Sequence, residues 1–148
     1  MSALIEHRPG QRQGIAIETT DAAHLAASRR RLTAAQRRWL GESGFEATPG
    51  SVALLPDSAG KLARVLVGVN PQDPLAALAG LPCSLPEANY QLASEGVLAD
   101  PSLAALGWAL GAYQFTRYRP AKRAPARLLV GAHELARLAP LVEATHRV

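Results

Sequence analysis

The sequence has few of the residues that mark secreted, membrane-spanning or disulfide-bonded proteins. Its single cysteine, Cys83, excludes an intramolecular disulfide and fits a reducing cytoplasm. No apolar run approaches the roughly 18 residues that a membrane-spanning helix needs. The first residues lack the apolar segment of a secretory signal. We therefore expect a cytoplasmic protein without a membrane partner, in which Cys83 is a small buried or half-buried hydrophobic residue.

Aromatic residues are also scarce, with two Trp, three Tyr and two Phe, whereas alanine and leucine are abundant. Of the 148 residues, 48% are hydrophobic and 19% are charged, which is typical of a globular chain. This length suits one domain. We therefore predict one main domain whose core consists largely of small aliphatic side chains.

The motifs of self-contained enzymes are missing as well. The four histidines, His7, His24, His133 and His146, are far apart in sequence and form no HxxxH or HExxH pair. There is no GxSxG nucleophile elbow, no GxGxxG turn after a strand and no phosphate-binding Walker loop. The residues therefore predict no catalytic residue, no metal site and no cofactor site in this chain.

The charge that is present is mainly basic and lies in two clusters, giving a net charge of +4. Such clusters bind phosphate backbones, but they also form solvated helix faces or contacts with another subunit. We favour the second interpretation and keep nucleic acid as the alternative. The candidate contact residues are Arg29, Arg30, Arg31, Arg37 and Arg38 in the first cluster, and Arg117, Arg119, Lys122 and Arg123 in the second, which Arg127 extends.

Hydrophobic patterning and capping residues predict strands that alternate with helices. Thr33 and Gln36 have the spacing of a capping box, so a helix should begin there and end at Gly41 or Gly44, with Ala35, Trp39 and Leu40 facing inward. We expect a three-layer α/β/α fold with a sheet flanked by helices. The other expected elements are strands at 14–19, 51–55, 62–69, 89–93 and 127–130, a short helix after Asp73, a helix at 101–115 and a helix from 132 onward.

The helix at 101–115 is the most informative stretch. It is hydrophobic on all sides and rich in small residues, so we expect it to lie between other layers with Trp108 and Leu110 in the core. Pro140 interrupts the last helical pattern and predicts a kink or restart there. We expect part of that helix to pack on this domain. The part after Pro140 should present an apolar strip to another surface.

Residues 106–118 read LGWALGAYQFTRY and resemble the segment LGxxLGxYxFxRY of the leucyl (cytosol) aminopeptidases, a family of di-metal exopeptidases. Residues 64–69 (RVLVGV) and 78–93 resemble further packing motifs of the same N-terminal domain. Ala88 stands where the family often has glycine. The resemblance covers about residues 14–148, and its motifs are specific as a set but weak singly.

This resemblance implies a macrodomain-like N-terminal domain with a mixed sheet at residues 14–131, after a flexible segment at 1–13. Residues 132–148 would be the helix that leads to a catalytic domain absent from this chain. In the family that second domain holds two divalent metal ions, zinc or manganese, and the protein forms a hexamer. No residue here matches the family's metal-binding motif NTDAEGRL, so no catalytic residue is carried over. The implied partners are the chain's own catalytic domain, further copies of the protein and DNA, which some bacterial relatives bind.

Two other functions stay open. A macrodomain-like fold also suits a free-standing module that binds ADP-ribose, another nucleotide or nucleic acid. An independent enzyme is the third alternative, and the missing metal ligands argue against it.

Overall fold

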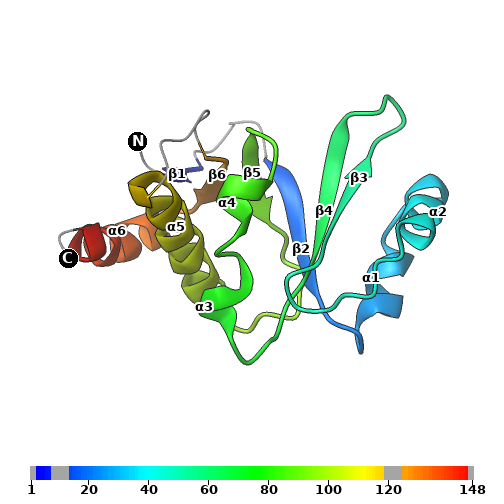
Figure 1. Ribbon diagram of the computed structural model, residues 1–148, viewed down its shortest axis with the longest axis horizontal. Helices are drawn as coiled ribbons and strands as arrows, with labels where there is room; N and C mark the ends of the chain where they lie inside the picture. The colour runs from blue at the N-terminus through cyan, green and yellow to red at the C-terminus, as the bar shows by residue number, and fades with distance from the viewer. Residues whose placement is uncertain (1–2, 8–13, 119–124, 147–148) are drawn as a thin grey trace.

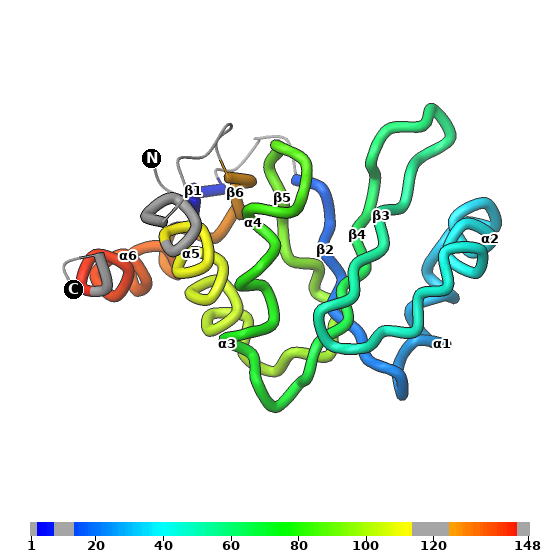
Figure 2. The backbone as a smooth tube through the Cα atoms, viewed as in Figure 1, coloured from blue at the N-terminus to red at the C-terminus, as the bar shows by residue number. Residues whose placement is uncertain are grey.

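The computed structural model describes residues 3–7, 14–118 and 125–146, and its centre is a six-stranded mixed sheet (Figures 1 and 2). The strand order is β1-β6-β5-β2-β4-β3. All neighbouring strands are parallel except β3, which is antiparallel to β4 and forms one edge of the sheet. The strands are β1 (Leu4–Glu6), β2 (Ile15–Thr20), β3 (Val52–Pro56), β4 (Leu62–Gly68), β5 (Asn89–Leu92) and β6 (Arg127–Val130).

Helices cover the sheet from both sides, which confirms the predicted layered α/β fold with its mixed sheet. On one side α1 and α2 enclose a small core, and on the other side α3, α4 and α5 enclose the larger core (Figure 1). The last helix, α6, packs on α5 and β1. No helix in the described ranges has the length and apolarity needed to cross a membrane. The helices are α1 (Leu25–Arg30), α2 (Ala34–Ser43), α3 (Pro74–Ala77), α4 (Leu81–Ser84), α5 (Pro101–Tyr118) and α6 (Ala132–His146).

The predicted capping box at the start of α2 is confirmed. The Thr33 hydroxyl accepts from the Gln36 amide, and the Gln36 side chain accepts from the Thr33 amide, both at 3.1 Å. The helix ends at Gly44, whose φ of 73° favours glycine. The expected inward face is wrong in two of three positions, because Ala35 and Trp39 are exposed while Gln36 is buried with Leu40.

Trp108 and Tyr90 form the centre of the larger core. Both side chains are fully buried, with ring centroids 6.0 Å apart. Each polar atom has a backbone acceptor: the indole N–H donates to Ala126 O at 3.2 Å and the phenol to Pro86 O at 2.7 Å. Trp108 is therefore a core residue as predicted, whereas Leu110 is only half-buried and not a core residue.

Two glycines allow α5 to lie against the segment that contains α3. A Cβ atom at Gly107 would overlap with the carbonyl oxygen of Leu75, and one at Gly111 would overlap with that of Ala79. Backbone and backbone are in direct contact there, so even alanine is too large. The small residues of this helix therefore determine how closely the helical layer packs.

Three elements were not expected from the sequence: β1, α1 and α4. Residues 4–6 form β1, whereas a flexible segment was expected over 1–13, because Leu4 is buried and pairs with Leu128 of β6. Residues 1–2 and 8–13 of that segment lie outside the described residues. The final helix α6 runs from Ala132 to His146 with Pro140 inside it.

Candidate functional site

The strongest electrostatic arrangement in the described structure surrounds Glu18 of β2, whose side chain is fully buried. The Arg31 guanidinium, just after α1, donates to both carboxylate oxygens, with Nη2–Oε2 at 2.7 Å and Nε–Oε1 at 3.3 Å. Arg64 of β4 donates to Glu18 Oε1 from the other side. The side chains of Arg31 and Arg64 are 37% and 20% exposed, and the buried Arg64 Nε has no hydrogen-bond partner among the described residues.

These contacts keep Glu18 ionised. Burial alone would raise the pKa of the carboxyl, but the hydrogen bonds from Arg31 and Arg64 outweigh it and hold the pKa below its ordinary value. The same pairing raises the pKa of Arg31. A catalytic base works best with a pKa near the working pH. The pKa of Glu18 is lowered, which is the opposite direction. We therefore interpret the cluster as structural, since it links the end of α1 and strand β4 to β2.

This cluster was not predicted from the sequence, although one signal was available. Glu18 interrupts the strand Ile15–Thr20 at a position on the face that α1 covers, where an unpaired carboxylate would be costly. Such a residue requires a cationic partner from a neighbouring element. The assignment of Arg31 as a surface contact residue overlooked that it serves as this partner.

The other arginines of the first cluster remain exposed on α1 and α2: Arg29, Arg30, Arg37 and Arg38. Arg37 donates from Nη1 to Leu32 O at 2.7 Å. None of the four forms an ion pair with another residue in the described part of the chain. Their assignment to nucleic acid or a subunit contact therefore stays a prediction.

The second basic cluster lies mostly outside the described residues, which leave out the side chain of Arg117 and the whole of Arg119, Lys122 and Arg123. Arg127 begins β6 and is half-buried. The contact assignment of this second cluster therefore stays a prediction.

The described histidines lie on different elements. His7 follows β1 and its amide donates to Val130 O, while its buried Nε2 has no hydrogen-bond partner among the residues that the structure describes. The exposed His24 lies 2.6 Å from Asp21, and this hydrogen bond holds the pKa of Asp21 below its ordinary value. His133 is exposed in the first turn of α6, and the side chain of His146 is not described. Within the described ranges, no group of three or more His, Cys, Asp or Glu residues is placed to hold a metal ion.

Two hollows open on the described surface. One, of about 280 Å³, lies at the carboxyl ends of β2, β5 and β6, which is where open α/β sheets commonly bind ligands. Its polar lining includes Thr19, Gln91, Ser94 and Glu134, and Glu134 accepts a hydrogen bond from the Ser102 hydroxyl at 2.8 Å.

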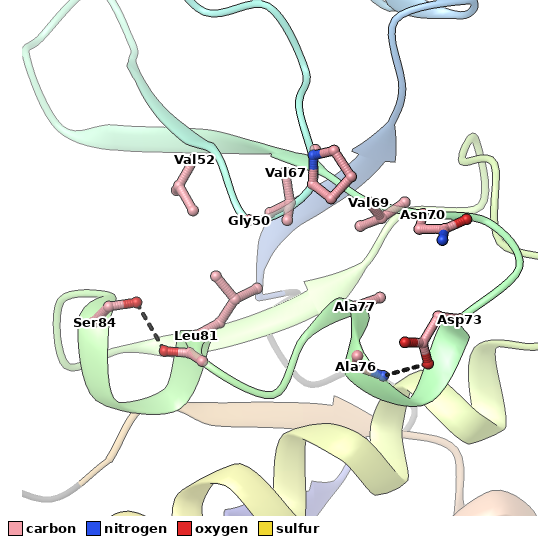
Figure 3. A pocket seen from close by; sticks show the side chains of 13 residues that line it. Gly50, Val52, Val67, Val69, Asn70, Asp73, Ala76, Ala77, Leu81 and Ser84 are labelled. Atoms are coloured by element: carbon pink, nitrogen blue, oxygen red, sulfur yellow. Dashed lines mark hydrogen bonds between the residues drawn. The ribbon is translucent and has the colours of Figure 1, made fainter.

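The second hollow, of about 200 Å³, lies between the start of β3 and the helices α3 and α4 (Figure 3). Val52, Val67 and Leu81 make much of it apolar. Its acidic residue, Asp73, is engaged as the cap of α3 and accepts from the Ala76 amide. Neither hollow was predicted from the sequence, because each joins residues from separate elements.

A family model described as the M17 aminopeptidase N-terminal domain matches residues 15–131. Among solved structures, the cytosol aminopeptidase from Coxiella burnetii is similar over 95% of this chain, with 26% identity and a TM-score of 0.82. The bottromycin maturation enzyme BotP (19% identity, TM-score 0.61) covers 90% of the chain. A mutant of tomato leucine aminopeptidase, with 18% identity and a TM-score of 0.53, is similar over 95% of this chain. No curated protein sequence matches this chain.

The chain spans only about a third of these structures, namely 31%, 31% and 34% of their lengths. The similarity to BotP and to the tomato enzyme concerns the fold alone. The match to the Coxiella burnetii structure is closer and extends over nearly all of this chain.

Proposed function

This chain belongs to the family of M17 aminopeptidase N-terminal domains, and we propose that it is the non-catalytic domain of a larger metal-dependent leucyl aminopeptidase in the cytoplasm. The observation that carries the proposal is the family match over residues 15–131 together with a solved relative about three times as long. Such a protein removes N-terminal residues from peptides. In it, this domain packs on the catalytic domain and supports assembly of a hexamer.

The two divalent metal ions of the proposed protein, zinc or manganese, belong to its catalytic domain. The residues described here do not fit a di-metal centre, since such a centre needs several ligands that converge on one point. His24 and Asp21 are close together, but they form only a pair on an exposed turn. We therefore assign no catalytic step to this chain.

The outer side of α6 is the surface that we assign to the catalytic domain. Leu138 is buried in the domain core, and Leu135 and Val142 are half-buried against it. Leu141, in contrast, is 52% exposed. We place the contact with the catalytic domain on this outer side, where Leu141 would be covered.

Metal binding by the 148-residue chain tests this proposal. Equilibrium dialysis against Zn²⁺ and Mn²⁺ should show no saturable binding, since the described residues provide no ligand set for a di-metal site. The matched control is a chain preparation dialysed with a chelator. Saturable uptake of two ions per chain would overturn the assignment as a non-catalytic domain.

The alternative is a free-standing module that binds ADP-ribose, another nucleotide or nucleic acid. The exposed arginines of α1 and α2 and the hollow at the carboxyl ends of β2, β5 and β6 favour it. Fluorescence anisotropy with labelled DNA and with labelled ADP-ribose distinguishes the two functions. Binding that weakens in Arg37→Ala and Arg38→Ala, and that falls with added salt, would support the nucleic-acid module.

A further inference from the structure

The edge strand β3 leaves apolar side chains uncovered on one face of the sheet. Val52 and Leu54 are 39% and 40% exposed, although their cross-strand partners Val67 and Val65 are almost fully buried. Cross-strand partners project from the same face, so both side chains lie on the side of α3, α4 and α5. Beside Val52 these helices leave the apolar hollow of Figure 3. This end of the larger core is therefore open.

Trp39 lies on the other face of the same edge and is 53% exposed. It stands one turn after Gln36 on the same flank of α2, and Gln36 donates from Nε2 to Pro56 O at the end of β3 (3.1 Å). The opposite flank of α2 faces α1, because a Cβ at Gly41 would contact the Arg29 guanidinium. We call Trp39, Val52 and Leu54 together the β3 edge surface.

The backbone of β3 is also open along this edge. The Gly68 amide donates to Ser51 O at 2.8 Å, and hydrogen-bonded pairs alternate along an antiparallel ladder. Ala53 and Leu55 therefore direct their backbone groups to β4, and Val52 and Leu54 direct theirs outward. Residues 51–55 contain neither a charged residue nor a proline, the usual devices that block further pairing. Pro56 and the register shift beside it hinder pairing with a further strand at the end of β3.

We propose that the β3 edge surface pairs with β3 of a second copy of this chain, about a two-fold axis that passes beside Ala53. This inference rests on the proposed function, since it names one surface through which the domain supports assembly. The axis places Val52 of one copy opposite Leu54 of the other, so both outward-facing residues find a backbone partner. The two sheets then become one continuous sheet.

A second copy fits this surface better than a single extended peptide. A peptide would satisfy the strand edge, but it would leave Trp39 on the other face uncovered. A two-fold axis perpendicular to the sheet keeps each face on its own side. It therefore brings the second α2 and its Trp39 beside the first, and it brings the two pairs of Val52 and Leu54 together. Because residues 51–55 carry no charge, no like charges oppose one another in this stretch.

The size of the contact predicts a weak dimer. Trp39 alone leaves roughly 130 Å² exposed, taking 53% of the about 250 Å² of a large aromatic side chain. One short strand and one helix flank per copy provide less than the roughly 800 Å² per partner of a standard interface. We therefore expect association that depends strongly on concentration in this chain and that further contacts reinforce in a larger assembly.

Sedimentation velocity of the 148-residue chain over a concentration series tests the proposal. The wild type should dimerise, and Leu54→Lys should require at least tenfold higher concentration, because it places a charge at the centre of the contact. Leu75→Lys is the matched control, since Leu75 is 41% exposed and lies on α3, the helix that packs on α5. Circular dichroism and thermal unfolding verify that both variants are folded.

Cysteine cross-linking tests the register independently. In a Cys83→Ala background, oxidation of a mixture of Val52→Cys and Leu54→Cys chains should give more cross-linked dimer than either variant alone. Directly opposite residues lie about 5.5 Å apart at their Cα atoms, which suits a disulfide.

A chain that stays monomeric throughout, or one whose dimers survive Leu54→Lys, would overturn the β3 contact. Equal cross-linking in the mixture and in the single variants would overturn it too. None of these results affects the assignment as a non-catalytic aminopeptidase domain, which metal binding tests separately.

Discussion

The buried ion cluster leads to a prediction for Glu18→Gln, which keeps the shape of the side chain but removes its charge. Arg31 and Arg64 then lose their shared counter-ion. Removing one partner of a buried ion pair costs about 3–5 kcal/mol. Since Arg31 and Arg64 remain 37% and 20% exposed, water replaces part of the lost contact. We therefore expect Glu18→Gln to lower the free energy of unfolding by about 3 kcal/mol at neutral pH, the lower end of this range.

The loss should also depend on pH. The pKa of Glu18 in the folded state lies below its ordinary value of 4.5. The cluster's contribution to the free energy of unfolding is therefore complete above pH 4.5 and is lost as the pH falls towards the folded-state pKa. The difference between the wild type and Glu18→Gln should be largest near neutral pH and should shrink in acid.

Urea unfolding followed by circular dichroism measures this difference at about pH 7, about pH 5 and about pH 3.5. Glu143→Gln, at an exposed position on α6, is the control and should change the free energy of unfolding by less than about 0.5 kcal/mol. If Glu18→Gln is as stable as the wild type at neutral pH, the ion cluster does not stabilise the fold. A loss that stays constant as the pH falls would refute the predicted pH dependence.

Three further predictions concern packing, each measured by denaturant unfolding. Gly111→Ala should cost about 1–3 kcal/mol, because the added Cβ overlaps with the backbone of Ala79. Gly80→Ala is the control and should not destabilise the fold, since there is open space around Gly80. Equal effects of the two variants would contradict the close approach of α5 to Ala79. Leu128 is 1% exposed and Leu110 only half-buried, so Leu128→Ala should cost about 2–5 kcal/mol and clearly more than Leu110→Ala. The reverse order would show that Leu110 is the core residue. Thr33→Ala should cost about 1 kcal/mol through loss of the α2 cap, and an unchanged midpoint would speak against the cap.

Local signals in the sequence predicted much of the fold. Thr33 with Gln36 marked the start of α2, and the pairs Asp73-Pro74 and Asp100-Pro101 marked the starts of α3 and α5, because caps depend only on residues within one turn. In the structure, the Asp100 carboxylate accepts from the amides of Ser102 and Leu103. The strands with several β-branched or apolar residues were also predicted from the sequence and are present in the structure. Local chemistry was sufficient for these elements.

The features that the sequence did not predict depend on contacts between distant segments. Strand β1 is only three residues long and is defined by its pairing with β6. Gln36 is buried in place of Trp39 because its side-chain amide donates to Pro56 O at the end of β3, a contact that helix periodicity does not contain. Glu18 has partners 13 and 46 residues away along the chain. The family resemblance, and not the local patterns, pointed to function.

Hydrolysis of leucinamide by the purified 148-residue chain tests whether this chain is a non-catalytic domain. The rate of leucine release is measured with Mn²⁺, with Zn²⁺ and with a chelator, at several chain concentrations. We expect the rate of buffer alone in every case, because the described residues provide no ligand set for a di-metal centre. Metal-dependent release of leucine that scales with chain concentration, and that follows the chain through successive purification columns, would show that the chain is itself catalytic.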